Sequence, residues 1–312
     1  MTTNTERRIC VVGSAMVDLV ARVPKLPEPG ETLVGSTFQI GFGGKGSNQA
    51  VMAARLGANV GMVARLGRDV FGENTLNNYK EQGIDTRFVL MDESRFSGVA
   101  PISVDEGSGQ NAIVIIPGAN MGLSPAGVRD ARELIQSAQI IICQLEIPIE
   151  STLEAFKLSR EAGVTTILNP APAVELPDEL LALTDICIPN ETEARILTGY
   201  TVDSPESAVP AGKALLEKGP RNVIITLGEK GAVCFEGDSV DYIPAEKVNA
   251  VDTTGAGDAF VGTLAFQLAG GHPMTSAIRS AVAVASRCVL KEGTQTSFPH
   301  YDDVVELLKG SE

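Results

Sequence analysis

Short apolar runs rich in β-branched residues alternate along the chain with segments of helical periodicity. The helical segments, such as 47–57 and 150–163, repeat apolar residues every three or four positions and end at glycine. Alternation of this kind predicts an α/β fold with a mostly parallel sheet and helices on both faces. Ligands are then expected beyond the carboxyl ends of the strands. The runs that predict buried strands are residues 8–13, 59–65, 139–144, 164–169, 185–190 and 222–228.

Two regions interrupt the alternation and predict a second, smaller sheet. Residues 20–40 and 96–116 carry short strands separated by polar, Gly- and Pro-rich turns, with no crossover helix. We expect them to form a small antiparallel lid over the ligand edge of the main sheet. No internal repeat, low-complexity segment or long linker divides the sequence. Residues 1–312 therefore predict a single domain with a lid rather than two independent domains.

Composition narrows the range of partners. The 312 residues include 25 Lys and Arg against 39 Asp and Glu, which gives a net charge of −14. This balance argues against nucleic acid or an anionic membrane as a partner, because both need a basic protein surface. A nucleotide stays compatible with an acidic protein, since phosphate sites are built from local backbone N–H groups rather than from net charge.

The cysteines and the N-terminus predict a soluble, cytoplasmic protein. The five cysteines are widely spaced in apolar surroundings, without a C-x-x-C pair, and the two histidines are too few to suggest a zinc site. We expect free, buried thiols in a reducing compartment. The segment 1–10 is charged and lacks the apolar core of a signal peptide, and no run reaches the length of a membrane span.

The glycine-rich segment 40–50, IGFGGKGSNQA, is the first candidate for a binding site. Its glycines would let the backbone come close to a ligand, and Lys45 and Asn48 could donate to hydroxyls or phosphate. A nucleotide P-loop needs Ser or Thr after the lysine, and a dinucleotide fingerprint needs its glycines directly after the first strand. Neither pattern is met. The alternative is a flexible turn without a ligand.

Carboxylates follow two of the predicted strands, at the edge where ligands are expected. Asp18 comes shortly after the first strand, and Glu146 follows the run 139–144. A carboxylate in the position of Asp18 could accept hydrogen bonds from two sugar hydroxyls, although a helix cap or a solvated acid would explain it as well. Glu146 by itself indicates no particular chemistry.

Two later segments each have two interpretations. In 188–199, Asn190 and Glu193 fit a capping box at a helix start. Alternatively, Asn190 lies near nucleotide phosphates and Glu193 near a hydrated magnesium ion. In 225–233, ITLGEKGAV, a strand ends in a glycine-containing turn, which predicts either a hairpin or a nucleotide-binding loop.

The segment 251–260, VDTTGAGDAF, predicts a glycine turn that enters an apolar helix. The N–H groups of Gly255, Ala256 and Gly257 would be unpaired at the helix N-terminus, where the helix dipole favours an anion. Asp258 follows them in the first turn. An acid beside an anion site suits a general base that takes a proton from an alcohol during phosphoryl transfer. The alternative is an ordinary acid that stabilises the helix dipole.

Taken together, these motifs resemble a known family. GFGGKGSNQA and VDTTGAGDAF resemble the two signatures of the phosphofructokinase-B-type (ribokinase-like) carbohydrate kinases. QLEIP, NPAPA (169–173), PNETEA (189–194) and ITLGEKG (225–231) also occur in the order and spacing of that family, and the resemblance runs from about residue 8 to about residue 300.

The resemblance implies a Rossmann-like α/β domain with a β-lid that also forms a homodimer interface. It implies ATP-dependent phosphorylation of the 5-hydroxyl of D-ribose, with Asp258 as the base and 255–257 as the anion hole. Glu193 would organise magnesium through water. The implied sugar-binding positions are Met16, Asp18, Gly44, Lys45, Gly46, Ser47, Asn48 and Glu146. The implied nucleotide-binding positions are Asn190, Thr226, Leu227, Gly228, Glu229, Lys230, Gly231, Gly257, Asp258 and Val282.

A potassium site is implied next to the anion hole. Asp252 has no Lys or Arg near it in sequence, and an unpaired, partly buried anion is costly, so a bound cation would supply its counter-charge. The implied ligands are Asp252, the backbone carbonyls of Thr254, Cys288, Lys291 and Gly293, and Ser297. The sequence departs from the family pattern at Met16, where many members have Asn near the sugar, and at Val282, where others have His or Asn near adenine.

Two other functions stay open. Another family member would act on deoxyribose, fructose or a nucleoside, although the absence of Trp and the low aromatic content of 4% disfavour a platform for a nucleoside base. A sugar- or nucleotide-binding regulator without catalytic activity is the second alternative. Asp258 beside an intact Gly-Ala-Gly turn argues against it, because binding alone needs no base.

Overall fold

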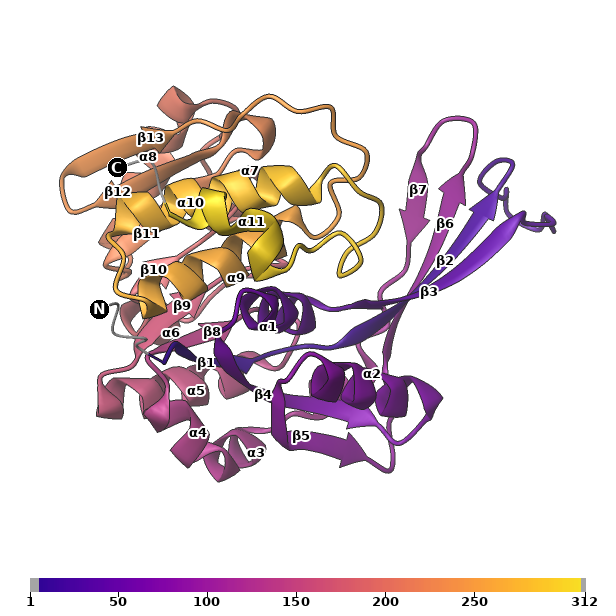
Figure 1. Ribbon diagram of the computed structural model, residues 1–312, viewed down its shortest axis with the longest axis horizontal. Coiled ribbons are helices and arrows are strands. Elements are labelled where there is room, and N and C mark those ends of the chain that lie inside the picture. Colours follow the sequence, from indigo (N-terminus) through magenta and orange to yellow (C-terminus); the bar gives the residue numbers. More distant parts are fainter. Residues whose placement is uncertain (1–5, 310–312) are drawn as a thin grey trace.

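The computed structural model describes residues 6–309, so both ends of the predicted domain 1–312 and the first half of the segment 1–10 lie outside the described part (Figure 1). The strands of the main sheet are β1 (Arg8–Val12), β4 (Asn59–Gly67), β5 (Asp85–Asp92), β8 (Ile140–Cys143), β9 (Thr165–Leu168), β10 (Ile186–Cys187), β11 (Asn222–Thr226), β12 (Ala232–Glu236) and β13 (Ser239–Ile243). Within residues 6–309 they form a nine-stranded sheet in the order β13-β12-β11-β10-β9-β8-β1-β4-β5.

The main sheet is mostly parallel, as predicted. Neighbouring strands from β5 across to β11 pair in parallel, and only β12 and β13 add an antiparallel edge. In the central strand β1, Val11 pairs with Met62 of β4 on one side and with Ile142 of β8 on the other. A parallel strand covered on both faces needs apolar residues at successive positions, and Ile9 to Val12 are all buried.

Helices cover both faces of the sheet (Figure 1). Alternate residues of β1 face opposite sides of the sheet. Ile9 and Val11 pack into an apolar cluster on one side, and Cys10 and Val12 pack into a cluster on the other side. Full burial of one such side chain contributes about 1.5–3 kcal/mol. One layer holds α1 (Lys45–Arg55), α2 (Val70–Glu81), α9 (Ala256–Ala269), α10 (Met274–Cys288) and α11 (Tyr301–Leu308). The other holds α3 (Pro125–Asp130), α4 (Arg132–Ser137), α5 (Ile149–Ala162), α6 (Asp178–Ala182), α7 (Glu191–Thr198) and α8 (Pro205–Glu217).

The lid is a separate four-stranded sheet that projects from the main body (Figure 1). Its strands are β2 (Met16–Val23), β3 (Thr37–Gly43), β6 (Gly98–Asp105) and β7 (Asn111–Ile113), in the order β3-β2-β6-β7. It therefore begins at Met16 rather than near residue 20. The prediction of a purely antiparallel lid is wrong, since β2 and β6 pair in parallel. Both strands continue from parallel strands of the main sheet, β1 and β5, and so leave it in the same direction.

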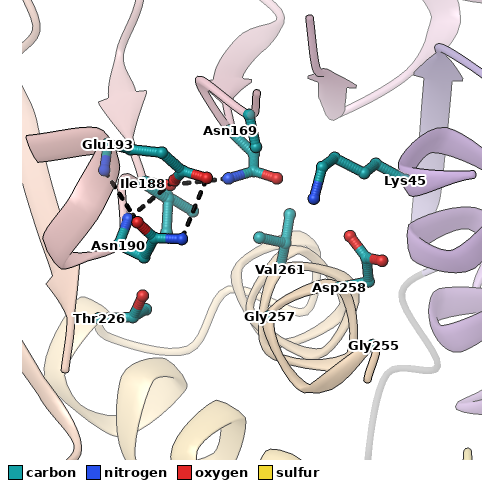
Figure 2. Close-up of a pocket in the computed structure, with 11 residues that line it drawn as sticks. Lys45, Asn169, Ile188, Asn190, Glu193, Thr226, Gly255, Gly257, Asp258 and Val261 are labelled. Atoms are coloured by element: carbon teal, nitrogen blue, oxygen red, sulfur yellow. Dashed lines mark hydrogen bonds between the residues drawn. The ribbon is translucent and has the colours of Figure 1, made fainter. Parts of the chain in front are cut away.

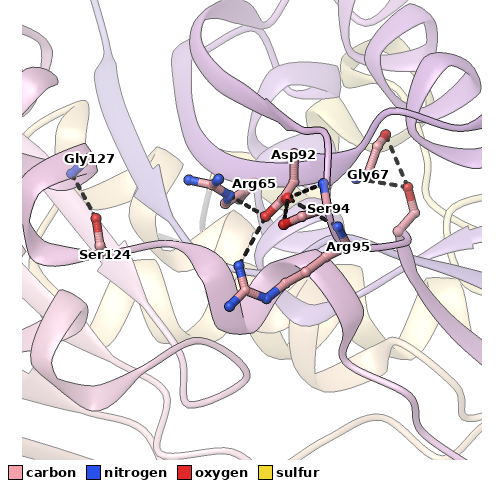
Figure 3. A network of polar contacts seen from close by, with 8 residues as sticks. Arg65, Gly67, Asp92, Ser94, Arg95, Ser124 and Gly127 are labelled. Carbon is pink, nitrogen blue, oxygen red and sulfur yellow. Dashed lines mark hydrogen bonds and ion pairs between the residues drawn. The ribbon is translucent and has the colours of Figure 1, made fainter.

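Two polar networks fix the lid to the main body. At the end of β5, the carboxylate of Asp92 is 2% exposed and accepts hydrogen bonds from the N–H of Ser94 at 2.8 Å and from Nε of Arg65 at 2.7 Å (Figure 3). Between β1 and β2, the N–H of Ala15 donates to Oδ1 of Asn120 at 2.9 Å, and Nδ2 of Asn120 donates to the Ala15 carbonyl at 2.8 Å. The places where the chain passes into the lid are thus held by buried hydrogen bonds.

Two further observations concern the membrane and thiol predictions. Along the described chain, no helix combines the length and the apolar character needed to cross a bilayer. All five cysteines are buried and free, as predicted.

Candidate active site

A cavity of about 180 Å³ opens at the carboxyl edge of the main sheet, where the strand–helix alternation placed the ligand (Figure 2). Asn169, Asn190 and Thr226 reach it from the ends of three neighbouring strands, β9, β10 and β11. Lys45 enters from the start of α1, and Asp258 from the first turn of α9. The cavity is therefore lined by segments that are distant from one another in the sequence.

The N-terminus of α9 is built to receive an anion. Gly255 has a φ of +79°, and a Cβ there would lie 2.6 Å from Cγ2 of Thr294, so only glycine fits. A Cβ at Gly257 would meet open space, so the helix end faces the cavity without obstruction. The N–H of Ala256 bonds to the carbonyl of Thr253 at 3.2 Å. The prediction that all three N–H groups are free is therefore wrong for Ala256, because the turn uses its N–H to close.

Asp258 lines the cavity, and its carboxylate is held by two side-chain amides. Nδ2 of Asn48 donates to its Oδ2 at 2.8 Å, and Nε2 of Gln49 donates to its Oδ1 at 2.9 Å. The side chain is 7% exposed. Each carboxylate oxygen can accept a further hydrogen bond. A substrate hydroxyl that reaches Asp258 can thus find an acceptor without displacing either amide.

Lys45 extends into the cavity beside Asp258 (Figure 2). Burial alone would lower the pKa of Lys45, but the carboxylates around it, Asp258 first, outweigh burial and raise that pKa. A charged ammonium and the free end of α9 therefore face the same space. This arrangement can stabilise the negative charge of a transferring phosphoryl group. Lys45, predicted as a sugar ligand, lines the cavity together with the predicted nucleotide-site residues Asn190 and Thr226.

Asp18 lies on lid strand β2, and not on the edge of the main sheet as the sequence suggested. Burial, and next the negative charges of Glu146 and Asp258, raise the pKa of Asp18 from 3.8 to about 6. Met16 is buried on the same strand and, two residues before Asp18, shares its face of the lid. The lid thus brings one carboxylate and one apolar side chain toward the site.

The glycine-rich turn at the start of α1 is packed against the chain between β1 and β2. Gly44 has a φ of +86°, and a Cβ there would lie 2.6 Å from the backbone nitrogen of Met16. At Gly46 a Cβ would lie 2.6 Å from the nitrogen of Ser14. The turn is therefore tightly packed and not flexible. These two glycines permit close packing of protein backbone, where the sequence suggested close approach to a ligand.

Two further residues of the predicted sugar site serve this packing as well. Oε2 of Glu146 accepts from Oγ of Ser14 at 2.5 Å and from the N–H of Lys45 at 2.9 Å, so it joins the two turns. Ser47 is fully buried, and its hydroxyl accepts from Nε2 of Gln295 at 3.0 Å. The Ser47 side chain therefore faces the interior, and the structure gives no support for its predicted contact with a sugar.

Asn190 and Glu193 form a capping box and line the cavity at the same time. The N–H of Glu193 donates to Oδ1 of Asn190 at 2.9 Å, and the N–H of Asn190 donates to Oε2 of Glu193 at 2.8 Å. Burial raises the pKa of Glu193. In the part of the chain that the structure describes, no three His, Cys, Asp or Glu side chains form a metal cluster. A single carboxylate at a cavity wall still suits magnesium, which keeps most of its waters and binds substrate phosphates.

The segment 225–233 is a hairpin between the antiparallel strands β11 and β12. Thr226 is its member that lines the cavity. Leu227 is buried in the core, and the amino group of Lys230 donates to the carbonyl of Asp203, so both side chains turn away. Val282, on α10, also packs into the core and does not line this cavity. The remaining predicted positions of the turn are Gly228, Glu229 and Gly231.

The two predicted potassium segments meet beside the end of α9. Oδ1 of Asp252 accepts from the N–H of Thr254, and Oδ2 accepts from the N–H of Gly293, each at 2.9 Å. Burial raises the pKa of Asp252, but these bonds and the positive charge of Arg22 bring it below its ordinary value. Arg22 reaches over from the lid and pairs with Glu292 at 3.0 Å. Asp252 therefore has a nearby guanidinium that its sequence neighbours did not indicate. The other predicted ligands in this region are Cys288, Lys291 and Ser297.

Several amides at the site were missed by the sequence interpretation. Gln49 and Gln144 are fully buried, and Nε2 of Gln144 donates to Oε1 of Gln49 at 2.5 Å. Asn169 accepts from Nε2 of Gln49 at 3.1 Å. Gln295 donates from Nε2 to Oδ1 of Asn48 at 3.1 Å. The available signal was a glutamine inside an apolar segment, since Gln144 directly follows the buried run of β8.

An acid at an open helix N-terminus with a lysine beside it, at the carboxyl edge of a mostly parallel sheet, is the arrangement expected of an α/β kinase. Residues 6–301 match the family model described as pfkB family carbohydrate kinase, and the chain belongs to this family. The resemblance drawn from the sequence motifs is thereby confirmed.

Relatives are similar to the chain over nearly its whole length. The deoxyribokinase of Salmonella typhi is 42% identical over 305 residues, covering 97% of this chain and 99% of that protein. The ribokinase of Mus musculus is 44% identical over 302 residues, covering 95% and 93%. The structure of Arabidopsis thaliana ribokinase complexed with ribose and ATP has a TM-score of 0.92 at 34% identity, covering 98% of this chain and 99% of that chain.

Proposed function

We propose that the protein transfers the γ-phosphoryl group of ATP to the 5-hydroxyl of D-ribose. The observation that carries this proposal is the position of Asp258, which lines the cavity from the first turn of α9 and is near enough to the lid carboxylate Asp18 to raise its pKa. The similar structure of Arabidopsis thaliana ribokinase is complexed with ribose and ATP and covers 98% of this chain. The sugar would lie on the lid side of Asp258, and the nucleotide on the side of Asn190 and Thr226.

In the proposed reaction, each residue of the site has a role. Asp258 accepts the proton of the sugar hydroxyl while the hydroxyl oxygen bonds to the γ-phosphorus and the bond to the ADP oxygen breaks. Lys45 and the N–H groups of Gly255 and Gly257 stabilise the charge on the transferring group. Glu193 would hold magnesium through water, and that ion neutralises phosphate charge when bound.

The test of the base is Asp258→Asn. The variant should still bind ATP and sugar, because Asn has the same shape and can hydrogen-bond, and it should lose roughly 10²–10⁴-fold in kcat. Asp303→Asn is the matched control, since Asp303 is an acid in the first turn of α11, outside the cavity. Near-normal turnover of Asp258→Asn would reject the proposed role and leave an acid that only stabilises the helix.

2-Deoxyribose is the second candidate substrate, and Met16 is the observation that favours it. The Met16 side chain is 4% exposed, shares the face of Asp18, and offers no strong hydrogen bond to a sugar hydroxyl. The related Salmonella typhi protein is a deoxyribokinase. We expect Met16→Asn to raise the preference for ribose over 2-deoxyribose by roughly 2–10-fold, the range of one hydrogen bond.

Release of ADP should be measured for ribose, 2-deoxyribose, fructose and a nucleoside, with the wild type and Met16→Asn. Turnover of the pentoses alone supports the proposal, and the ratio of their kcat/KM values decides between ribose and 2-deoxyribose. Turnover of fructose or the nucleoside alone would point to the wider alternatives within the family. No turnover with any of the four would favour a binding protein without catalytic activity.

We further propose that potassium binds between the loop of Asp252 and the segment 288–297. Support comes from the contact between the two segments, because the N–H of Gly293 donates to Oδ2 of Asp252 and so holds the two loops together. The ion would not touch the substrate. It would fix the turn at Gly255 and so aim the helix N–H groups before the phosphoryl group arrives.

A homodimer through the lid is the last part of the proposal. On the face of the lid opposite Asp18, Phe38 and Ile40 of β3 pair with Ala21 and Leu19 of β2. Phe38 is 61% and Ile40 59% exposed, so an apolar strip of sheet faces outward. Apolar strips of this kind mark protein–protein interfaces. A second copy would cover it while Asp18 keeps facing the sugar.

A further inference from the structure

The carboxylate of Asp258 is gripped from both sides by consecutive residues of one helix. Asn48 donates to Oδ2 and Gln49 donates to Oδ1. Both residues lie in α1, while Asp258 begins α9. A carboxylate held at only one oxygen could still rotate about its own bond. Two amides, one on each oxygen, prevent that rotation.

Each of these amides is itself held by a second amide. Nε2 of Gln295 donates to Oδ1 of Asn48 at 3.1 Å, and Nε2 of Gln144 donates to Oε1 of Gln49 at 2.5 Å. An amide whose oxygen is occupied in this way must turn its NH₂ group in the opposite direction. The outer pair therefore determines that Asn48 and Gln49 present donors, and not oxygens, to Asp258.

The outer amides are fixed by the fold and not by the substrate. Oε1 of Gln295 accepts from Nδ2 of Asn78 at 3.0 Å. Gln144 directly follows β8, and a Cβ on Gly13 would lie 2.2 Å from its Oε1. Among the described residues, that Oε1 has no hydrogen-bond partner although it is buried. Burying an unpaired polar atom is costly, and an apolar side chain at position 144 would avoid the cost.

We infer that Asn48, Gln49, Gln144 and Gln295 form an amide clamp that holds Asp258 in its working orientation, with Gln144 and Gln295 as positioning residues that do not touch the substrate. This inference rests on the proposed function, in which Asp258 is the base. The clamp leaves one acceptor site on each oxygen for the sugar hydroxyl. Loosening it should slow the chemical step while leaving binding unchanged, because proton transfer depends on alignment.

The test replaces each outer amide by an apolar side chain of similar size, Gln144→Met and Gln295→Met. Gln267→Met is the matched control, because Gln267 is also buried, lies on α9, and donates to Ser280 and to the Leu308 carbonyl, far from Asp258. The rate of phosphoryl transfer should be measured in a single turnover at saturating ATP and sugar. We expect a loss of roughly 3–10-fold in each clamp variant, with KM values changed less than about twofold, and a normal rate in the control.

Normal single-turnover rates in both clamp variants would overturn the inference, and so would an equal loss in Gln267→Met. A rise in KM without a fall in the rate would also overturn it, since it would place these residues in binding. If Gln144→Met does not fold, Gln295→Met decides, because it frees the other oxygen independently. Asp258→Asn separates the two proposals. Turnover in that variant rejects the proposed base, whereas an inactive Asp258→Asn beside normal clamp variants rejects only the clamp.

Discussion

Asp18→Asn should make the ligand-free protein more stable while it weakens sugar binding. Burial, and then Glu146 and Asp258, raise the pKa of Asp18 from 3.8 to about 6. The ionised carboxylate is therefore less favourable in the folded protein than in the unfolded chain. A shift of about two pKa units corresponds to about 2–3 kcal/mol at 1.36 kcal/mol per unit. Removing the charge should recover this free energy of unfolding.

The size of this gain depends on pH. Above about pH 6, Asp18 is charged in both states, and the full cost is present. Between about pH 6 and 3.8, the folded protein binds a proton that the unfolded chain does not. The cost of Asp18 therefore decreases, and the free energy of unfolding rises, as the pH falls through this range. Below 3.8 both states are protonated. The gain from Asp18→Asn should thus be complete at pH 7 and disappear near pH 4.

Thermal unfolding at pH 8, 7, 6 and 5 measures this gain. With about 2.1 cal/mol/K of unfolding entropy per residue, 312 residues give about 0.65 kcal/mol/K. The Tm should therefore rise by about 3–5 °C at pH 7. The KM for the sugar should rise by roughly 10–100-fold, because each hydrogen bond to a charged group contributes about 1.5–3 kcal/mol. The wild-type KM should also rise as the pH falls below about 6, when Asp18 takes up its proton.

Asp92→Asn is a control for which we expect the opposite change in the free energy of unfolding. Burial raises the pKa of Asp92, but hydrogen bonds from Ser94 and Arg65 hold it well below its ordinary value. This variant should lose stability at pH 7, and its deficit should shrink on acidification. Equal Tm values for Asp18→Asn and the wild type at pH 7, or a gain that does not change with pH, would refute the reasoning. An unchanged sugar KM would show that Asp18 is not a sugar ligand.

Three further predictions concern the ions and the lid. Potassium should raise kcat relative to a choline salt of equal ionic strength, sodium and lithium should do so poorly, and Asp252→Ala should abolish the effect while sugar binding stays intact; equal rates in the two salts would exclude the cation site. Glu193→Gln should raise the magnesium concentration needed for half-maximal turnover by roughly tenfold, as expected from loss of one charged ligand interaction, and an unchanged requirement would place magnesium elsewhere. Ile40→Lys should yield a monomer in sedimentation velocity, and a persistent dimer would mean that another surface joins the copies.

Local patterns were sufficient for the framework of the fold. The apolar runs of β1, β4 and β8 and the glycine-terminated helix α5 lie where the sequence placed them. Each of these elements depends on residues within a few positions, so its periodicity is visible without tertiary information. The same holds for the start of α9, because the turn at Gly255 and the acid of the first helical turn are contiguous in sequence.

Long-range contacts account for what the sequence did not reveal. Asn48 and Asp258 are 210 residues apart, and Gln295 and Asn48 are 247 apart, so no local pattern connects them. Arg22 approaches Asp252 only because the lid extends over the loop. Gly44 has the same sequence signal whether it admits a ligand or the backbone of Met16. In each case, the packing of distant elements determines which residue lies next to the one that the sequence pattern identified.

The order of elements along the chain has a consequence for biosynthesis. All four strands of the lid are complete by residue 113, whereas α9 begins at Ala256. The face of the main sheet that carries Ile9 and Val11 stays partly uncovered until α9 and α10 have been made. A nascent chain that lacks α9 therefore exposes this apolar face and does not yet contain Asp258. The segment that shields it also delivers Asp258, so folding competence and enzymatic competence are reached in the same late step of translation.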